Sequence, residues 1–143
     1  MKVRATQVSL ISDAYGYDVE ALLGMHLRRY EVKAGGPHTQ HSFHLSRNEF
    51  DTGQLWPDSW RIIQVVFTAA AFTADEIRNE HVQHIRELDA TAVRQAVVED
   101  SATFTWDQSS IVTPAADSWK PSILALDSEF ATAGFHITGS ASP

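Results

Sequence analysis

Two apolar runs separated by a single glycine constrain the fold of this chain more than any other feature. Residues 17–23 and 27–32 are rich in strand-forming side chains, and Gly24 lies between them, where a hairpin turn is expected. Two runs joined in this way are expected to pair as neighbouring strands. The segment therefore predicts a β-hairpin within a small sheet.

Three charged residues flank this hairpin at one end. Asp18 lies near the start of the first run, and Glu31, Val32 and Lys33 close the second. Because side chains alternate along a strand, Glu31 and Lys33 should share a face, and Val32 should be buried on the other. Pairing of the two runs would bring Asp18 close to Glu31. Two carboxylates and a lysine are the chemistry of a divalent-metal site with a lysine beside the attacking water, although such residues are also common as surface charges.

A second group of segments follows the hairpin. A Gly-Gly-Pro loop at 35–37 precedes a short strand-like run at 42–45, and a buried-strand run occupies residues 60–67. Between them Ser46 and Glu49 have the spacing of a capping box, which predicts a helix over residues 46–55 and gives Glu49 a structural role rather than a chemical one. The histidines of the intervening loop, His38, His41 and His44, are expected to be exposed rather than to form a metal cluster.

The order of these segments resembles the PD-(D/E)XK nuclease superfamily. It is most similar to the domain at the C-terminus of the plant NO VEIN protein, which is related to Mrr-type restriction nucleases. The matching pieces are a glycine–aromatic–aspartate, an E-V-K, an apolar segment ending in S-R-N-E, and a strand, found here at residues 16–18, 31–33, 43–49 and 61–67. The resemblance covers about residues 12–68.

The resemblance implies an α/β fold of the restriction-endonuclease type, with a central mixed β-sheet and flanking helices. It also implies hydrolysis of DNA phosphodiesters with Mg²⁺, for which Mn²⁺ would substitute. In that scheme Asp18, Glu31 and the backbone carbonyl of Val32 hold the metal. Lys33 orients or deprotonates the attacking water, so Asp18, Glu31 and Lys33 are the expected catalytic residues.

The overall charge is unfavourable for a tight DNA binder. Lysine and arginine total 11 against 18 acidic residues, and the net charge is −7. A free-standing DNA-binding protein usually carries a basic patch. Basic residues are nevertheless present near the candidate site, and the start of an exposed helix can bind phosphate. The residues expected to contact DNA are Arg28, Arg47 and Asn48.

Composition and length limit the remaining possibilities. A chain of 143 residues with 43% hydrophobic side chains suggests one globular domain, predicted over residues 1–130, with a flexible tail at 131–143. The absence of cysteine excludes disulfides and thiolate zinc sites and fits a cytoplasmic location. The sequence shows no signal peptide and no apolar run of membrane-spanning length.

The second half of the chain is predicted mainly from periodicity. Ile77, His81, Ile85 and Leu88 recur at helical spacing behind a capping-box pattern, so residues 73–88 are predicted to form a helix in which His81 packs inward. Further elements are expected as a strand within residues 2–11, a short helix over 90–98 and a strand over 101–106.

The resemblance implies a metal-dependent DNA endonuclease that takes part in restriction or anti-phage defence. The expected partners are DNA and other domains or subunits of a defence system, with a homodimer left open and no membrane association. Two alternatives remain. One is a catalytically inactive nuclease-like module that binds DNA or protein within a larger protein, and the other is a small α+β scaffold without catalysis.

Overall fold

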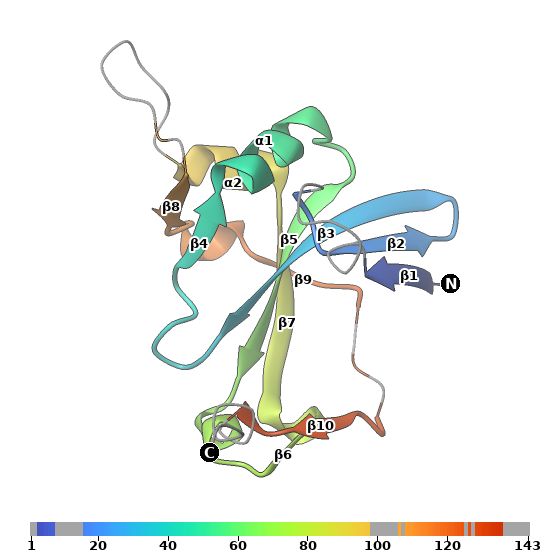
Figure 1. The fold of residues 1–143 in the computed structure, drawn as a ribbon, viewed down its shortest axis with the longest axis vertical. Coiled ribbons are helices and arrows are strands. Elements are labelled where there is room, and N and C mark those ends of the chain that lie inside the picture. The colour runs from blue at the N-terminus through green and yellow to red at the C-terminus, as the bar shows by residue number, and fades with distance from the viewer. Residues whose placement is uncertain are drawn as a thin grey trace.

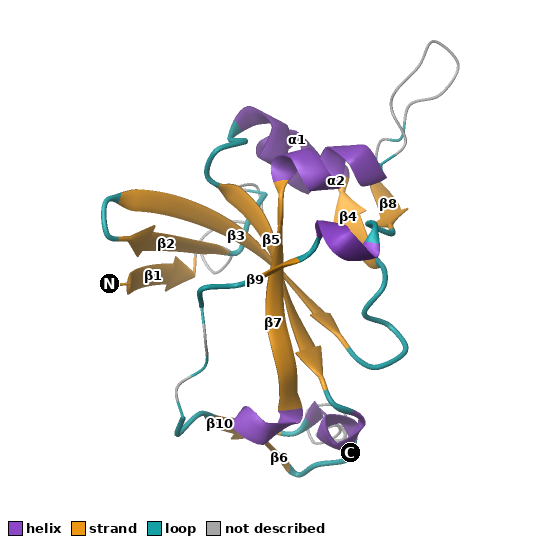
Figure 2. Ribbon diagram, turned by 180° about the vertical axis from the view of Figure 1, so that it is seen from behind, coloured by secondary structure: helices purple, strands orange, loops and turns teal. Residues whose placement is uncertain are grey.

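The computed structural model describes residues 3–7, 16–97, 106, 108–124, 126 and 128–135. Its centre is a six-stranded mixed sheet with the order β1-β2-β3-β5-β7-β9 (Figures 1 and 2). The β3–β5 pair is parallel and the other neighbouring pairs are antiparallel. The strands are β1 (Val3–Gln7), β2 (Val19–Leu23), β3 (His26–Gly35), β5 (Trp60–Phe67), β7 (Val82–Asp89) and β9 (Lys120–Pro121). The predicted α/β class with a central mixed sheet and flanking helices is confirmed, and it is compatible with a restriction-endonuclease-like fold.

The predicted hairpin is present as β2 and β3. Leu23 pairs with His26, which leaves Gly24 and Met25 as a two-residue turn. Gly24 has a φ of +66°, a conformation that short hairpin turns require and that glycine adopts without a Cβ penalty.

The parallel pairing of β3 with β5 requires a connection that crosses one face of the sheet. That connection contains β4 (Phe43–Ser46), which pairs with β8 (Ser109–Val112), and α1 (Arg47–Leu55). The helix α2 (Ala90–Ala96) follows β7 and lies beside α1 (Figures 1 and 2). The capping box predicted for α1 is confirmed, since Ser46 Oγ accepts the Glu49 N–H at 3.0 Å and Glu49 Oε1 accepts the Ser46 N–H at 2.9 Å.

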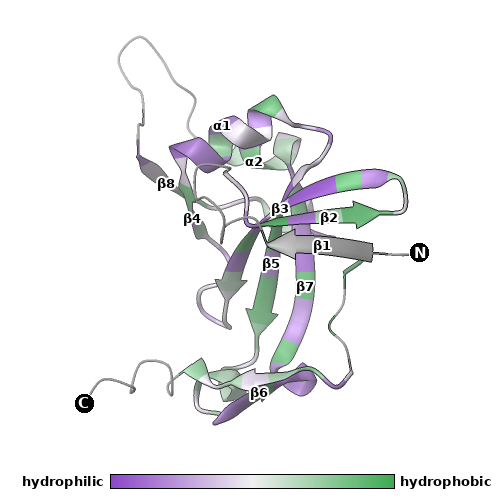
Figure 3. Cartoon of the chain, turned by 45° about the vertical axis from the view of Figure 1, so that its right-hand side comes forward, coloured by the Kyte–Doolittle hydropathy of each residue, from purple (hydrophilic) through white to green (hydrophobic). Residues whose placement is uncertain are grey.

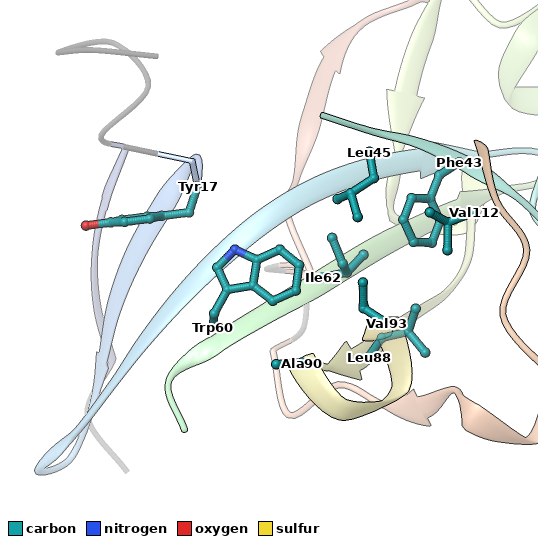
Figure 4. Packing of buried hydrophobic residues seen from close by; sticks show 9 residues of the cluster. All are labelled: Tyr17, Phe43, Leu45, Trp60, Ile62, Leu88, Ala90, Val93 and Val112. Atoms are coloured by element: carbon teal, nitrogen blue, oxygen red, sulfur yellow. The ribbon is translucent and has the colours of Figure 1, made fainter. Parts of the chain in front are cut away.

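Each face of the sheet carries its own apolar core. The larger core is formed by β5 together with the helices, β4 and β8, and Figure 4 shows the Trp60 indole between Tyr17 and Ile62. Trp60 Nε1 also donates a hydrogen bond of 3.2 Å to the carbonyl of Gly16. The opposite face holds a smaller cluster of Ala21, Leu23, Tyr30 and Ile63. In Figure 3 the arrow end of β5 is green; this end of the strand holds Val65, the fully buried Val66 and Phe67.

The helix predicted over residues 73–88 is wrong. This stretch forms β6 (Glu76–Arg78), a 3-10 turn (Asn79–His81) and β7, and no capping box begins at Thr73, which ends the 3-10 helix at Ala69–Phe72. Ile85 and Leu88 fit helical spacing, yet on β7 they face opposite sides of the sheet. Ile85 packs on the smaller core and Leu88 belongs to the larger one, so pairing with β5 overrides the helical pattern.

The other expected elements are found where the structure describes them. The helix expected over 90–98 is α2, and Asp89 caps it by accepting the Ala92 N–H at 2.8 Å. The strand expected within residues 2–11 is present as β1. The strand expected over 101–106 lies outside the described residues except for Trp106.

The remaining expectations concern the chain end, the loop histidines and membrane spans. The segment predicted as a tail begins with β10 (Ala131–Ala133), which pairs with β6, and the Phe135 ring then packs on Phe67 and Phe72. The loop histidines His38, His41 and His44 are exposed, as predicted. In the part of the chain that the structure describes, no helix has the length and apolarity needed to cross a membrane.

Candidate functional site

Asp18 is fixed at the edge of β3 by two hydrogen bonds. Its backbone N–H donates to the Tyr30 carbonyl at 2.8 Å, and its Oδ2 accepts the Val32 N–H at 2.9 Å. The N–H and C=O of one strand residue point to the same side, so the Val32 carbonyl also faces the Asp18 side of β3. The structure therefore brings Asp18 and the Val32 carbonyl together at one end of the hairpin.

The two faces of β3 are the reverse of what the sequence suggested. Glu31 is only 5% exposed, whereas Val32, predicted to be buried, is 39% exposed. The reason is that Glu31 lies opposite Ile62 on the face that the β4–α1 connection covers. Val32 lies on the opposite face of β3, together with Tyr30. The smaller core on that face includes Tyr30 but does not include Val32.

Lys33 lies on the covered face with Glu31, as the alternation predicted. Its Nζ is 3.4 Å from Oε1 of Glu31 and 3.1 Å from Oε1 of Glu49. Glu49 thus has two roles, because the oxygen that caps α1 also accepts a hydrogen bond from Lys33. Sequence reasoning had favoured the capping role of Glu49 over direct chemistry. The missed signal was the crossover itself, which must carry the S-R-N-E segment over the strand that holds Glu31.

Burial and mutual repulsion govern the ionisation of the two glutamates. Burial, a hydrogen bond with Glu49 and the charge of Glu49 raise the pKa of Glu31 to about 9, although Lys33 opposes this shift. Burial alone would raise the pKa of Glu49 as well. Its hydrogen bonds with Glu31 and with the Ser46 N–H, and the charge of Lys33, outweigh burial and lower that pKa. The raised pKa of Glu31 and the lowered pKa of Glu49 therefore favour a shared proton on Glu31 over one on Glu49.

Asp18, Glu31 and Glu49 are among the residues that line a cavity of about 270 Å³. Asp18 and Glu31 enter from the hairpin, and the first turn of α1 closes the other side (its hydrophilic start is the purple end of α1 in Figure 3). Gly16 permits this close approach: a Cβ there would lie 2.0 Å from Oγ1 of Thr52, and its φ of +72° also favours glycine. The lining residues are Gly16, Tyr17, Asp18, Glu31, Ser46, Asn48 and Glu49.

The donor atoms at this cavity suit a hard divalent cation. Mg²⁺ takes oxygen ligands, commonly one or two carboxylates with several waters. Asp18 and Glu31 line the cavity and supply such oxygens, and the Val32 carbonyl lies on the Asp18 side of β3. No group of three or more histidine, aspartate or glutamate side chains stands ready to enclose an ion among the described residues. A cation held by these oxygens would have to take its remaining ligands from water, and Glu31 would have to release its proton to bind it.

The three residues expected to contact DNA are not brought together. Arg28 shares its face of β3 with Tyr30, away from the cavity, and its guanidinium donates to the carbonyls of Leu27 and Asp58. Asn48 alone among them lines the cavity.

Arg47 is tied to the fold rather than directed at the cavity. Its Nε bonds Oδ1 of Asp51 at 3.0 Å, one terminal nitrogen donates to the carbonyl of Trp106 at 3.0 Å, and the guanidinium lies 4.9 Å from the Trp106 ring centroid. These contacts follow from its place in the first turn of α1, where an i,i+4 acid and a neighbouring aromatic ring are within reach.

Comparison with known families gives one result. The family model described as "Protein NO VEIN, C-terminal" matches residues 3–85, which is more than half of the chain. The matched region contains Asp18, Glu31, Lys33 and Glu49. Neither the curated proteins nor the solved structures give a match. The chain therefore belongs to the family of NO VEIN C-terminal domains.

Proposed function

We propose that this domain is a Mg²⁺-dependent endonuclease that hydrolyses DNA phosphodiesters in a restriction or anti-phage defence system. The observation that carries the proposal is the cavity that Asp18 and Glu31 both line, with Lys33 Nζ 3.4 Å from Oε1 of Glu31. The resemblance of NO VEIN C-terminal domains to PD-(D/E)XK nucleases supports the choice of reaction. Mn²⁺ is expected to substitute for Mg²⁺.

The metal would be held by Asp18, Glu31 and the Val32 carbonyl. When bound, the cation would supply positive charge to the attacked phosphate and acidity to a water ligand. Asp18 is already oriented for this role by the Val32 N–H. To bind the cation, Glu31 would change from a carboxylic acid to a carboxylate, and its buried position would limit the access of bulk water to the charges.

Lys33 supplies the second positive charge. Its ammonium group contacts both Glu31 and Glu49, so it would stay anchored to Glu49 if Glu31 bound a cation. From that position it offsets negative charge that develops on the phosphate and orients the attacking water. Glu49 is a positioning residue for Lys33, and it is itself held by the capping box.

The test is a plasmid-cleavage assay beside metal-binding calorimetry on the same preparations. The wild-type chain should nick or cut DNA with Mg²⁺ or Mn²⁺, while Ca²⁺ should support binding without cutting. Glu31→Ala should lose both metal binding and cleavage. Methylated and unmethylated plasmids should both be offered. Metal binding without cleavage of either would favour the inactive nuclease-like module instead.

A further inference from the structure

A second hollow lies directly beside the candidate active site. It has a volume of about 460 Å³, which falls within the range of pockets that hold small organic ligands. Tyr17 and Asn48 line both hollows, so the two share a wall. We call the second one the aromatic cleft; its lining residues are Tyr17, Arg29, Asn48, Asp51, Thr52, Leu55 and Trp56.

The wall of the aromatic cleft is a stack of flat groups. The Arg29 guanidinium lies 4.2 Å from the Trp56 ring centroid and 5.8 Å from that of Tyr17. A hydrogen bond of 2.5 Å to Oγ of Ser59 holds Arg29 in place. The stack is therefore fixed by the protein itself before any ligand arrives.

The stack is also open to solvent. Trp56 is 44% exposed although it caps the end of α1, where its N–H donates to the Thr52 carbonyl at 3.0 Å. Its neighbour Leu55 is 70% exposed. An exposed tryptophan with a cation stacked on it is the chemistry that proteins use to bind unpaired nucleobases.

The distribution of charge favours an unpaired strand over an intact duplex. Binding along a duplex relies on many cations that contact phosphates, and the net charge here is −7. Arg28 lies on the other face of the sheet and Arg47 is bonded to Asp51, whereas Arg29 is the arginine that lines the aromatic cleft. Base stacking contributes affinity without adding phosphate contacts.

We propose that the aromatic cleft binds an unpaired DNA nucleotide, with its base stacked on the Trp56–Arg29 pair next to the phosphate to be cut. The chain then prefers single-stranded or frayed DNA to intact duplex. The position of the scissile phosphate rests on the proposed function, but the binding preference does not require cleavage.

The test measures binding in Ca²⁺ by fluorescence anisotropy, with one labelled oligonucleotide offered as a single strand and as its duplex. Wild type should bind the single strand more tightly. Trp56→Ala should weaken single-strand binding by about fivefold to 150-fold, the loss expected for one stacked base. Trp56→Tyr should restore most of it. Phe72→Ala is the matched control, because Phe72 is 45% exposed and lies outside the cleft, and it should bind like wild type.

Abasic substitution in the oligonucleotide separates base stacking from backbone contact. Removing the bases should lower wild-type affinity by the same factor as Trp56→Ala, and the two changes should not add. This arm remains informative if Trp56→Ala does not fold. Equal affinity for single strand and duplex, or unchanged affinity for the abasic strand, would overturn the inference. If wild type still cleaves DNA when the binding inference fails, the proposed endonuclease function stands. If DNA binding depends on Trp56 but no DNA is cleaved, the aromatic cleft is supported and the proposed endonuclease function is wrong.

Discussion

The Nζ of Lys33 donates a hydrogen bond of 3.1 Å to Oε1 of Glu49, and the same oxygen accepts the backbone N–H of Ser46 at 2.9 Å. One atom therefore joins the start of α1 to the lysine of the candidate active site. The helix cap and the contact with Lys33 can be tested separately, because some substitutions affect only the cap and others affect the lysine.

The two roles of Glu49 can be tested by comparing three variants. Ser46→Ala removes the cap but leaves Glu49 beside Lys33, so it should lower the free energy of unfolding by about 1 kcal/mol and leave cleavage largely unchanged. Glu49→Gln keeps an oxygen for the cap but removes the charge that holds Lys33, so cleavage should fall while stability changes little. Glu49→Ala should lose both. Urea denaturation and plasmid nicking on the same samples measure the two effects.

Thr73→Ala is the matched control for the cap. Thr73 had the same capping-box spacing in the sequence, but its hydroxyl donates only a 3.4 Å hydrogen bond to the Ala70 carbonyl at the end of a 3-10 helix. Its free energy of unfolding should match that of wild type to within about 0.5 kcal/mol. A loss as large as that of Ser46→Ala would mean that the cap is not what stabilises α1.

Lys33→Ala should abolish cleavage and leave metal binding measurable, because lysine contributes charge and is not a metal ligand. In the absence of metal, Lys33→Ala should also lower the free energy of unfolding by about 1–3 kcal/mol. The reason is that Glu31 and Glu49 lose the cation that both contact in a mostly buried site. Calorimetry with Ca²⁺ and thermal denaturation with and without Mg²⁺ measure these effects. If Lys33→Ala cuts as fast as wild type, the proposed mechanism is wrong even with the fold intact.

The protonation of Glu31 predicts how stability depends on pH. Its pKa of about 9 in the folded protein lies above the ordinary value of 4.5, so the folded state retains a proton that the unfolded state loses between these values. The stabilisation is complete below about pH 4.5 and is lost as the pH rises toward 9. Wild-type urea midpoints should fall across this window. Glu31→Gln, which donates a hydrogen bond at every pH, should flatten the decline, and parallel curves for the two proteins would contradict this assignment.

Metal binding should release a proton. Because Glu31 is protonated at neutral pH and must ionise to bind a cation, Mg²⁺ binding should expel about one proton per site. Calorimetric titrations in two buffers with different ionisation enthalpies give this number directly. Asp18→Asn is the comparison, since it should weaken binding without changing the proton count per bound ion. Binding without proton release would place the ion away from Glu31.

Local features of the structure were predicted well from the sequence. The turn at Gly24, the capping box of α1 and the common face of Glu31 and Lys33 each depend on residues within one element or its immediate neighbour. Sequence spacing determines such features, because backbone geometry converts a fixed separation into a fixed direction.

Features that depend on distant pairing were not predictable in the same way. The spacing of Ile77, Ile85 and Leu88 fits a helix. Only the pairing of β7 with β5 shows that Ile85 and Leu88 pack in different cores. Likewise, the alternation places Glu31 and Val32 on opposite faces but does not say which face the β4–α1 connection covers.

The parallel pairing of β3 with β5 also sets an order of assembly. The β2–β3 hairpin is local and can close within microseconds, which already places Asp18 beside Val32. Glu31 meets Glu49 only after β4 and α1 fold back over the sheet, a step that requires closing a longer loop. Before that contact forms, we expect Glu31 to be hydrated, with a pKa near its ordinary value. If α1 docks late, as we expect, this step should take up a proton from solvent, and its rate should depend on pH.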